Sequence, residues 1–373
     1  MIRNEKRRAE LRPQGFESPS CNGCQWRKDC GGFHNGRLIG NCFEETCCEF
    51  TGKDKDKCNA VCPYKNDFDD WLADTMGLQF DDLPTFAQPI LDLPVYIPVI
   101  DHRSRRVAPL NWPVVSLTTY NVLRMHRGSG EYRAVSNDPD SLRDHFLLGK
   151  DTKIVLRGVA RDSQLERYWE NHAAAAAPAQ LARLNIHAVM GPNFSHFLDV
   201  PRTDHLFNKR RQLLCLSDLH AAGMATVPHL NAVMPGDWRF WTTFLQRNSS
   251  VRVVAIEFQT GNKNPTQGKK AIEHLATVQN SIRRPLHPVL VGGAQYVEFV
   301  STRFQQFTLT DSTPFIKALH RQKVSRTDGK VAWKSRFRLD RQDVDELLID
   351  NIRGYSDWIE ERARRARSGA ILN

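Results

Sequence analysis

The sequence predicts an α/β fold in which eight parallel strands and the helices between them close into a TIM-type (β/α)8 barrel. From about residue 90 onward, short apolar runs rich in β-branched residues alternate with longer segments of helical spacing. Runs that are apolar along their whole length are typical of parallel strands covered by helices on both faces. Eight such runs occur between residues 95 and 310, and this number favours a closed barrel over an open sheet.

The order of the predicted elements follows from these runs. No glycine-rich phosphate-binding fingerprint comes after any of them, which counts against a nucleotide-binding doubly wound sheet. The predicted strands cover residues 95–100, 114–117, 153–159, 186–190, 225–230, 251–258, 285–291 and 307–310, and the predicted helices between them include residues 162–177, 206–222, 237–246 and 269–281.

The carboxyl-terminal stretch predicts one more helix. Apolar residues recur at a spacing of three to four from Val344 to Ile359, within a segment that covers residues 343–367 and ends in basic residues. The apolar face is expected to pack, whereas the basic end is either a solvated surface or a contact with DNA. The expected domains are a cysteine-rich metal-binding segment (1–80), a catalytic barrel (81–330) and a basic helical extension (331–373).

The cysteines are concentrated near the amino terminus. Eight of the nine lie between Cys21 and Cys62, and Cys215 stands alone in an apolar run. The chain begins with charged residues and no apolar stretch follows them, so we expect no secretory signal, a cytoplasmic location and reduced thiols. Metal ligation therefore explains the cluster better than disulfides. A segment with so few branched aliphatic residues is expected to need its metal in order to fold.

The identity of this metal stays open between a [4Fe-4S] cluster and zinc. Zinc accepts sets of four cysteines on short loops. A Cys-x2-Cys-x5-Cys run with a distant Cys-Pro resembles the iron–sulfur motif of some nucleases that act on DNA ends, which favours the cluster. The candidate ligands are Cys21, Cys24, Cys30, Cys42, Cys58 and Cys62.

Charge favours a polyanionic partner. The chain has 52 Lys and Arg against 42 Asp and Glu, a net charge of +10. The basic residues cluster at 103–106, 209–211, 269–270 and 362–367, and such clusters suit DNA. No run of about 18 apolar residues is present, so we expect no membrane-spanning helix.

Polar residues follow the predicted strands, where a barrel of this type builds its active site. Carboxylates, amides and a Gly-Gly pair converge on this rim, a combination that suits a sugar or base substrate. A lone Asp in such a position is often only the amino-terminal cap of the next helix. The candidate site residues are Asp162, Asn193, Phe194, Asn231, Glu257, Gly292, Gly293 and Asp311.

Several of these motifs resemble, in their order, the barrel of the tRNA-guanine transglycosylase superfamily. Gly292-Gly293 and the later segment 309–318 are similar to the end of that barrel, where the family carries a nucleophilic aspartate. Asp162-Ser163 is similar to the Asp-Ser-Gly-Gly-Phe motif that holds the base, and Gly191-Pro192-Asn193 resembles the Pro-Asp of the next loop.

One feature of that family has no counterpart in this chain. The family's zinc site follows the barrel, and here no cysteine comes after Cys215. The chain is therefore more similar to the branch, found in phages and bacterial genomic islands, that exchanges guanine in DNA for a 7-deazaguanine. A phage-encoded member would act in the host cytoplasm.

The resemblance implies a mechanism with DNA and a 7-deazaguanine, such as 7-cyano-7-deazaguanine, as substrates. Asp311 would attack C1′ of a deoxyguanosine and form a covalent intermediate, while Asp162, as a partly buried carboxylate with a raised pKa, would hold the base and move its proton. The flipped base would be bound by Asn193, Asn231, Glu257, the Gly292-Gly293 backbone and the ring of Phe194.

Two other classes remain open from the sequence. The cysteine cluster also suits an iron–sulfur-containing DNA nuclease, or a non-catalytic, metal-dependent DNA-binding protein.

Overall fold

The computed structural model describes residues 23–30, 57–126, 128–197, 200–327, 329–335 and 341–371. The chain divides into two compact units. The first unit comprises Met1–Thr85, Phe194–Ser217 and Asn231–Asn248, and the second comprises Phe86–Asn193, Asp218–Leu230 and Ser249–Asn373. Two stretches that were expected in the barrel domain thus associate with the amino-terminal part of the chain. The carboxyl-terminal helix belongs to the second unit.

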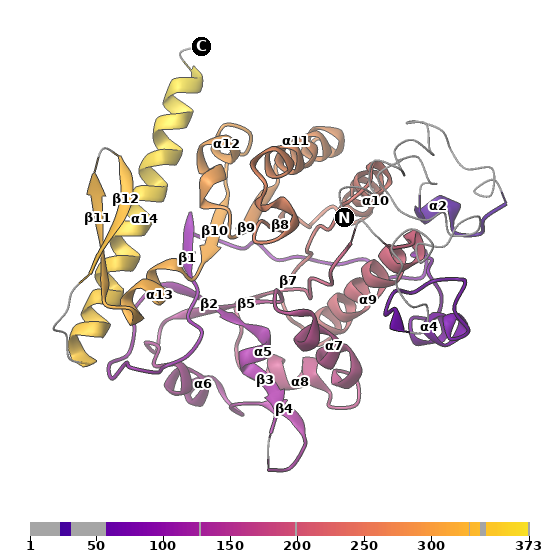
Figure 1. Cartoon of the computed structure of the whole chain (residues 1–373), viewed down its shortest axis with the longest axis horizontal. Helices are drawn as coiled ribbons and strands as arrows, with labels where there is room; N and C mark the ends of the chain where they lie inside the picture. Colours follow the sequence, from indigo (N-terminus) through magenta and orange to yellow (C-terminus); the bar gives the residue numbers. More distant parts are fainter. Residues whose placement is uncertain are drawn as a thin grey trace. The chain divides into compact units, whose positions relative to one another are not determined.

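The second unit contains two four-stranded parallel sheets, so the predicted α/β class with parallel strands is confirmed (Figure 1). Every predicted apolar run overlaps one of the eight strands. One sheet has the order β1-β10-β9-β8, with β1 (Tyr96–Pro98), β10 (Thr308–Asp311), β9 (His287–Val291) and β8 (Val253–Glu257). The other has the order β2-β5-β6-β7, with β2 (Val114–Thr118), β5 (Lys153–Arg157), β6 (Ala188–Met190) and β7 (Thr226–Val227).

Helices connect most of these strands, as the alternating pattern predicts. The helix expected over 162–177 ends earlier, at Asn171. A second helix begins at Ala177 with Pro178 in its first turn, and Ala176 before it has a positive φ of 47°. The helices in the described part of the chain are α2 (Arg27–Cys30), α4 (Phe68–Asp74), α5 (Thr119–Val122), α6 (Pro139–Phe146), α7 (Asp162–Asn171), α8 (Ala177–Ala182), α9 (Arg202–Ala221), α10 (Pro235–Arg247), α11 (Pro265–Ile282), α12 (Val297–Ser301), α13 (Thr313–Leu319) and α14 (Arg341–Ile371), with short 3-10 turns η3 (Gly261–Lys263) and η4 (Ala294–Tyr296).

Two antiparallel hairpins were not predicted. They are formed by β3 (Leu123–Met125) with β4 (Tyr132–Ala134), and by β11 (Gln322–Thr327) with β12 (Lys330–Ser335). The strands of the first hairpin are only three residues long, and no strand residue of the second hairpin is buried. Hydrophobic pattern alone therefore gave no strand signal in these segments.

Backbone contacts also link the edge strands of one sheet to those of the other. A parallel bridge pairs Val99, just after β1, with Ser116 of β2, and another pairs His229, just after β7, with Ala255 of β8. Gln88 spans β7 and β8 as well. Its Nε2 donates to the carbonyl oxygens of Thr226 and Val253, each at 2.9 Å, and its Oε1 accepts from the Val253 amide at 2.8 Å.

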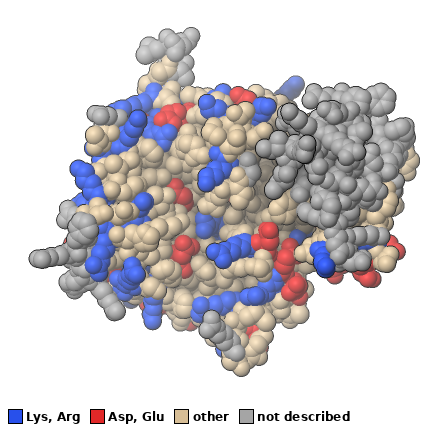
Figure 2. Space-filling view, in the orientation of Figure 1, with Lys and Arg blue, Asp and Glu red and all other residues tan. Residues whose placement is uncertain are grey.

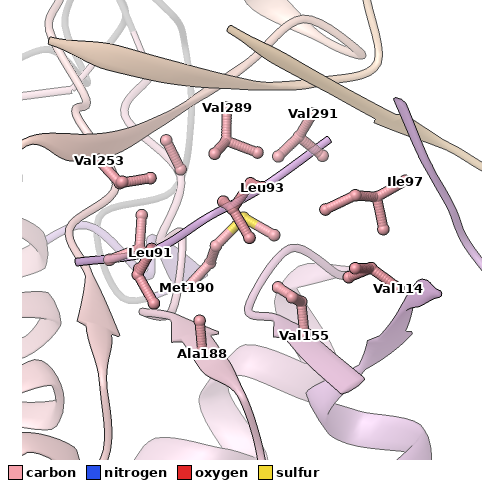
Figure 3. Packing of buried hydrophobic residues seen from close by; sticks show 12 residues of the cluster. Leu91, Leu93, Ile97, Val114, Val155, Ala188, Met190, Val253, Val289 and Val291 are labelled. Atoms are coloured by element: carbon pink, nitrogen blue, oxygen red, sulfur yellow. The ribbon is translucent and has the colours of Figure 1, made fainter. Parts of the chain in front are cut away.

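The core of the second unit lies between the two sheets (Figure 3). Side chains from β8 and β9 and side chains from β2, β5 and β6 point toward one another, with Leu91 and Leu93 between them. This apolar layer contains Ile97, Val114, Val155, Ala188, Met190, Val227, Val253, Ala255, Val289 and Val291. Polar residues follow these core residues at the carboxyl ends of the same strands.

Candidate functional site

Side chains alternate between the two faces of a strand, and this alternation decides which residues at the strand ends face the apolar core. Residues two apart lie on the same face of a strand. Glu257 of β8 follows the core residues Val253 and Ala255 at this spacing, and Arg157 of β5 follows Val155. Glu257 and Arg157 therefore lie on the core-facing side of their sheets, at the ends where parallel α/β folds build their sites.

Glu257 is a buried carboxylate held in a fixed orientation. Its side chain accepts hydrogen bonds from the Gln259 amide and from the Thr260 hydroxyl, the latter at 2.8 Å. Burial raises the pKa of Glu257, and these two hydrogen bonds offset part of that effect. A carboxylate with a raised pKa at a strand end suits nucleophilic or proton-transfer chemistry.

Arg157 is a functional candidate that the sequence analysis missed. Its side chain is 8% exposed, and Nη2 donates to the Thr118 hydroxyl at 3.2 Å. Within the described part of the chain, its Nε and Nη1 are buried without a hydrogen-bond partner. Burial lowers the pKa of Arg157, while the charges of Asp101 and Asp311 oppose this effect. A buried guanidinium with unused donors suits an anionic or carbonyl-bearing ligand.

Asp311 lies at the end of β10, but on the other face of that strand. Its neighbour Thr310 pairs with the core residues Ile97 and Val291, so Asp311 points away from the core. One carboxylate oxygen accepts from the Thr313 amide at 2.8 Å and the other from the Tyr355 hydroxyl of α14 at 3.1 Å. Burial raises the pKa of Asp311, and the two hydrogen bonds and the charge of Arg157 lower it in part.

Asp162 has a different environment from the one expected. It is the first residue of α7 and is exposed, whereas the mechanism implied by the resemblance needs a partly buried carboxylate with a raised pKa. The physical reason is its position on the outer side of a helix start, five residues beyond the end of β5. The structure thus brings Asp162 to the carboxyl end of the sheet but does not bury it.

The backbone conformation and the packing of the turn after β9 explain why both residues of the Gly292-Gly293 pair are glycines. Both residues have positive φ angles, 74° and 84°. A Cβ at Gly292 would meet Gln259 Cγ at 2.8 Å, and one at Gly293 would meet Phe258 Cβ at 2.8 Å. The pair therefore lets the turn after β9 pack against the segment after β8, close to Glu257 in sequence.

The remaining predicted residues divide between the two units. Asn193, in the second unit, donates its backbone amide to the Gly158 carbonyl at 2.9 Å, and no residue that the structure describes bonds its buried Oδ1. In the first unit, Asn231 donates to the Phe194 carbonyl at 3.0 Å. Phe194 is 1% exposed and its ring lies 3.9 Å below the guanidinium of Arg211. Its burial and this contact cover the ring of Phe194, and its expected base-stacking role stays a prediction.

The cysteine segment belongs to the first unit, and only part of it is described. Cys24 and Cys58 are partly exposed and Cys30 and Cys62 are buried, while the predicted ligands Cys21 and Cys42 lie outside the described residues. No group of three or more His, Cys, Asp or Glu side chains in the described ranges is arranged to hold a metal ion. The metal site stays a prediction.

The start of α9 anchors both described cysteine segments. Arg202 donates to the Cys30 carbonyl at 3.3 Å, Thr203 donates to the Val61 carbonyl at 2.7 Å, and the Val61 amide donates to Asp204 at 2.9 Å. Cys30 and Val61, the neighbour of Cys62, are thus held by consecutive residues of one helix turn.

Buried cations of α9 surround the side chain of Cys30. Arg202 and Lys209 both interact electrostatically with it and both form ion pairs with buried Asp237 of α10. Burial alone would raise the pKa of Asp237, but these cations hold it well below its usual value. Two cations against one carboxylate leave a net positive charge in the buried cluster beside Cys30.

Comparisons with known proteins identify no family for this chain. Neither protein-family models nor curated proteins match the chain.

The length and hydropathy of the helices can be compared with the expectation that no helix spans a membrane. In the described part of the chain, none is both long and apolar enough to cross a bilayer.

Proposed function

We propose that this chain is a transglycosylase that exchanges guanine in DNA for a 7-deazaguanine. The site would lie at the carboxyl ends of the parallel strands of the second unit. Support comes from the strand-end motifs that resemble the guanine transglycosylase superfamily, from the basic surface, and from the buried charged side chains at those strand ends. The observation that carries the proposal is the presence of Glu257 and Arg157 on the core-facing side of β8 and β5.

The two parallel sheets are proposed to form one closed (β/α)8 barrel. The bridges Val99–Ser116 and His229–Ala255 join the edge strands in parallel, and Gln88 ties β7 to β8. Closure would make the ring β1-β2-β5-β6-β7-β8-β9-β10. It would bring the eight strand ends to one rim, so that residues far apart in the sequence could contact one nucleotide.

The catalytic carboxylate in this proposal is Glu257 rather than Asp311. A nucleophile must face its substrate, and Glu257 lies on the core-facing side of its strand while Asp311 lies on the opposite side of β10. The hydrogen bonds to Glu257 fix its orientation and leave lone pairs for attack. Asp311 would act as a positioning residue that fixes α13 and α14 and contributes negative charge near Arg157.

The reaction then proceeds as a double displacement at C1′ of the deoxyribose. Glu257 attacks C1′ as the C1′–N9 bond breaks, and guanine leaves with the bonding electrons and takes up a proton. The incoming 7-deazaguanine loses its N9 proton and attacks C1′, which releases Glu257. The exchange is proton-neutral overall, because the proton that the 7-deazaguanine loses balances the proton that guanine takes up. Arg157 would bind an acceptor atom of the flipped nucleotide.

Release of guanine from DNA tests this proposal. Duplex DNA labelled in its guanine bases is incubated with the protein and a 7-deazaguanine, and soluble label is counted. Wild type is expected to release label only with the deazaguanine present. Glu257→Gln should reduce release by about a thousandfold or more, while the exposed control Glu170→Gln should match wild type.

Three outcomes contradict parts of the account. Absence of release by wild type overturns the transglycosylase proposal. Loss of release in Asp311→Asn together with full release in Glu257→Gln returns the covalent role to Asp311. Strand cleavage in place of base release favours the nuclease class.

A further inference from the structure

We propose that a groove between the carboxyl-terminal half of α14, the β11–β12 hairpin and the turn after β9 binds the sugar–phosphate backbone of DNA and leads it to the strand-end site. This inference rests on the proposed function, because it takes DNA as the substrate. It adds a binding surface that is separate from the residues assigned to the chemistry.

The groove is formed by residues of the second unit and has a volume of about 740 Å³. Three kinds of element line it. Gln295 and Glu298 come from the turn and helix after β9, Lys330 from the hairpin, and Trp358, Arg362 and Arg365 from α14. A phosphate backbone needs an open, elongated surface rather than a closed pocket, and a groove between a helix and a hairpin has that form.

The groove reaches the strand ends through the turn that follows β9. Arg362 donates to the Ala294 carbonyl at 2.8 Å, and Ala294 follows the Gly292-Gly293 pair directly. Farther along the same helix, Arg367 donates to the carbonyl oxygens of Ser301 at 3.2 Å and Gln305 at 3.0 Å. These contacts fix α14 along the loop and helix after β9, so that the groove ends beside the edge where Glu257 lies.

The electrostatics of the groove favour a polyanion. Its two nearest carboxylates are neutralised within the protein, because Glu298 pairs with Arg362 and Glu361 pairs with Arg326 and Arg365. The groove is lined by three cations, Lys330, Arg362 and Arg365, and by one acidic residue, Glu298. In the described part of the chain, exposed Lys330 has no acidic partner. Lys and Arg side chains gather over this flank of the second unit, on the left in Figure 2. A groove whose cations outnumber its carboxylates favours the binding of phosphates.

Local packing holds the cations at the groove wall. The guanidinium of Arg362 lies 4.4 Å from the centre of the Trp358 ring, and the indole nitrogen of Trp358 donates to the Gly329 carbonyl at 2.9 Å. The hairpin turn is thereby tied to α14, with Lys330 next to the tie. A surface whose cations are already ordered loses less conformational entropy when it binds.

A charge-reversal experiment tests the groove. The double variant Lys330→Glu/Arg365→Glu is compared with wild type and with Arg167→Glu/Arg183→Glu, which changes two exposed arginines at α7 and just after α8 by the same total charge. Affinity for a fluorescein-labelled DNA duplex is measured by anisotropy over a range of salt concentrations. Thermal unfolding curves verify that all three proteins are folded.

The groove variant is expected to bind DNA roughly ten- to a hundredfold more weakly at 0.1 M salt, with a slope of log K against log salt that is shallower by about 2. The control variant should stay within about threefold of wild type, since nonspecific loss of net charge acts weakly through screening. Equal losses in the two variants would overturn the groove. If wild type itself does not bind DNA, the substrate of the proposed function fails instead, and the two failures are thus distinguished.

Discussion

The hydroxyl of Tyr355, on helix α14, donates a hydrogen bond to the carboxylate of Asp311 at the end of strand β10, with 3.1 Å between Oη and Oδ2. Both groups are buried, and the ring of Tyr355 also packs on Tyr96 of β1 at 5.2 Å. Burial raises the pKa of Tyr355 and of Asp311. The hydroxyl therefore keeps its proton, and its hydrogen bond stabilises the buried carboxylate. This contact fixes the last helix to the strand end.

Removal of this donor should destabilise the protein in a pH-dependent way. Tyr355→Phe leaves the Asp311 carboxylate with one donor fewer, which should lower the free energy of unfolding by about 1 to 3 kcal/mol at pH 8. The loss should shrink as the pH falls through the raised pKa of Asp311, because a protonated carboxyl needs the donor less. Urea unfolding at several pH values measures it. In an Asp311→Asn background the same change should cost clearly less, and equal costs in both backgrounds would show that the two residues are not coupled.

Glu257→Gln should stabilise the protein while it removes activity. Burial raises the pKa of Glu257, so between the unfolded value near 4.5 and the folded value the unfolded chain is ionised and the folded one is not. The stability of wild type therefore falls as the pH rises through this interval, and the variant escapes that loss. Its unfolding midpoint should match wild type near pH 4 and exceed it at pH 8. A lower midpoint for the variant at pH 8 would show that ionised Glu257 is stabilised by its surroundings.

Gln88 should contribute strongly to stability. It is 7% exposed, and its side chain makes four hydrogen bonds to the backbone of β7, β8 and Arg252, at 2.8 to 2.9 Å. Gln88→Ala leaves these buried backbone groups without partners, and we expect a loss of about 2 to 4 kcal/mol in urea unfolding. Gln246→Ala, on an exposed position of α10, should change the stability by less than about 0.5 kcal/mol. Similar small losses for both variants would contradict the bridging role of Gln88.

Metal content should depend on the amino-terminal cysteines and not on Cys215. Cys215 is buried in α9, so Cys215→Ser is a matched control for the loss of a buried thiol. Elemental analysis of anaerobically purified protein is expected to find iron or zinc in wild type and in this control, and at most about half as much in Cys30→Ser. A visible absorption band would identify the iron–sulfur cluster. Metal-free wild type would contradict the prediction.

The strands were predictable because buried parallel strands leave a simple signature. In the run 251–258, the four residues 253–256 are all apolar and buried since both faces of the strand are covered, and the run contains β8 at Val253–Glu257. The hairpin strands β11 and β12 carry no such signature, because their side chains are not buried. The association of 194–217 with the amino-terminal residues could not be predicted, since it depends on long-range contacts within the first unit such as Arg210–Asp82 and Thr203–Val61.

The site was only partly predictable for a related reason. A residue that follows a strand is expected at the carboxyl end of the sheet. Which face of the sheet its side chain occupies depends on the alternation of side chains along that strand. Thr310, not Asp311, shares the phase of the core residues, and this distinction needs the register with β1 and β9. Arg157 was not predicted because it lies inside the predicted strand 153–159, whereas the candidate residues near this strand were those that follow it. Alternation counted from Val155 is the signal that could have found it.

The most direct test of the central claim is mass spectrometry of nucleosides from duplex DNA that has been incubated with the full chain and 7-cyano-7-deazaguanine. We predict that digestion yields the 2′-deoxyribosyl derivative of the added base, with an equal loss of deoxyguanosine, for wild type but not for Glu257→Gln. Digests in which wild type leaves every deoxyguanosine unchanged would contradict the claim.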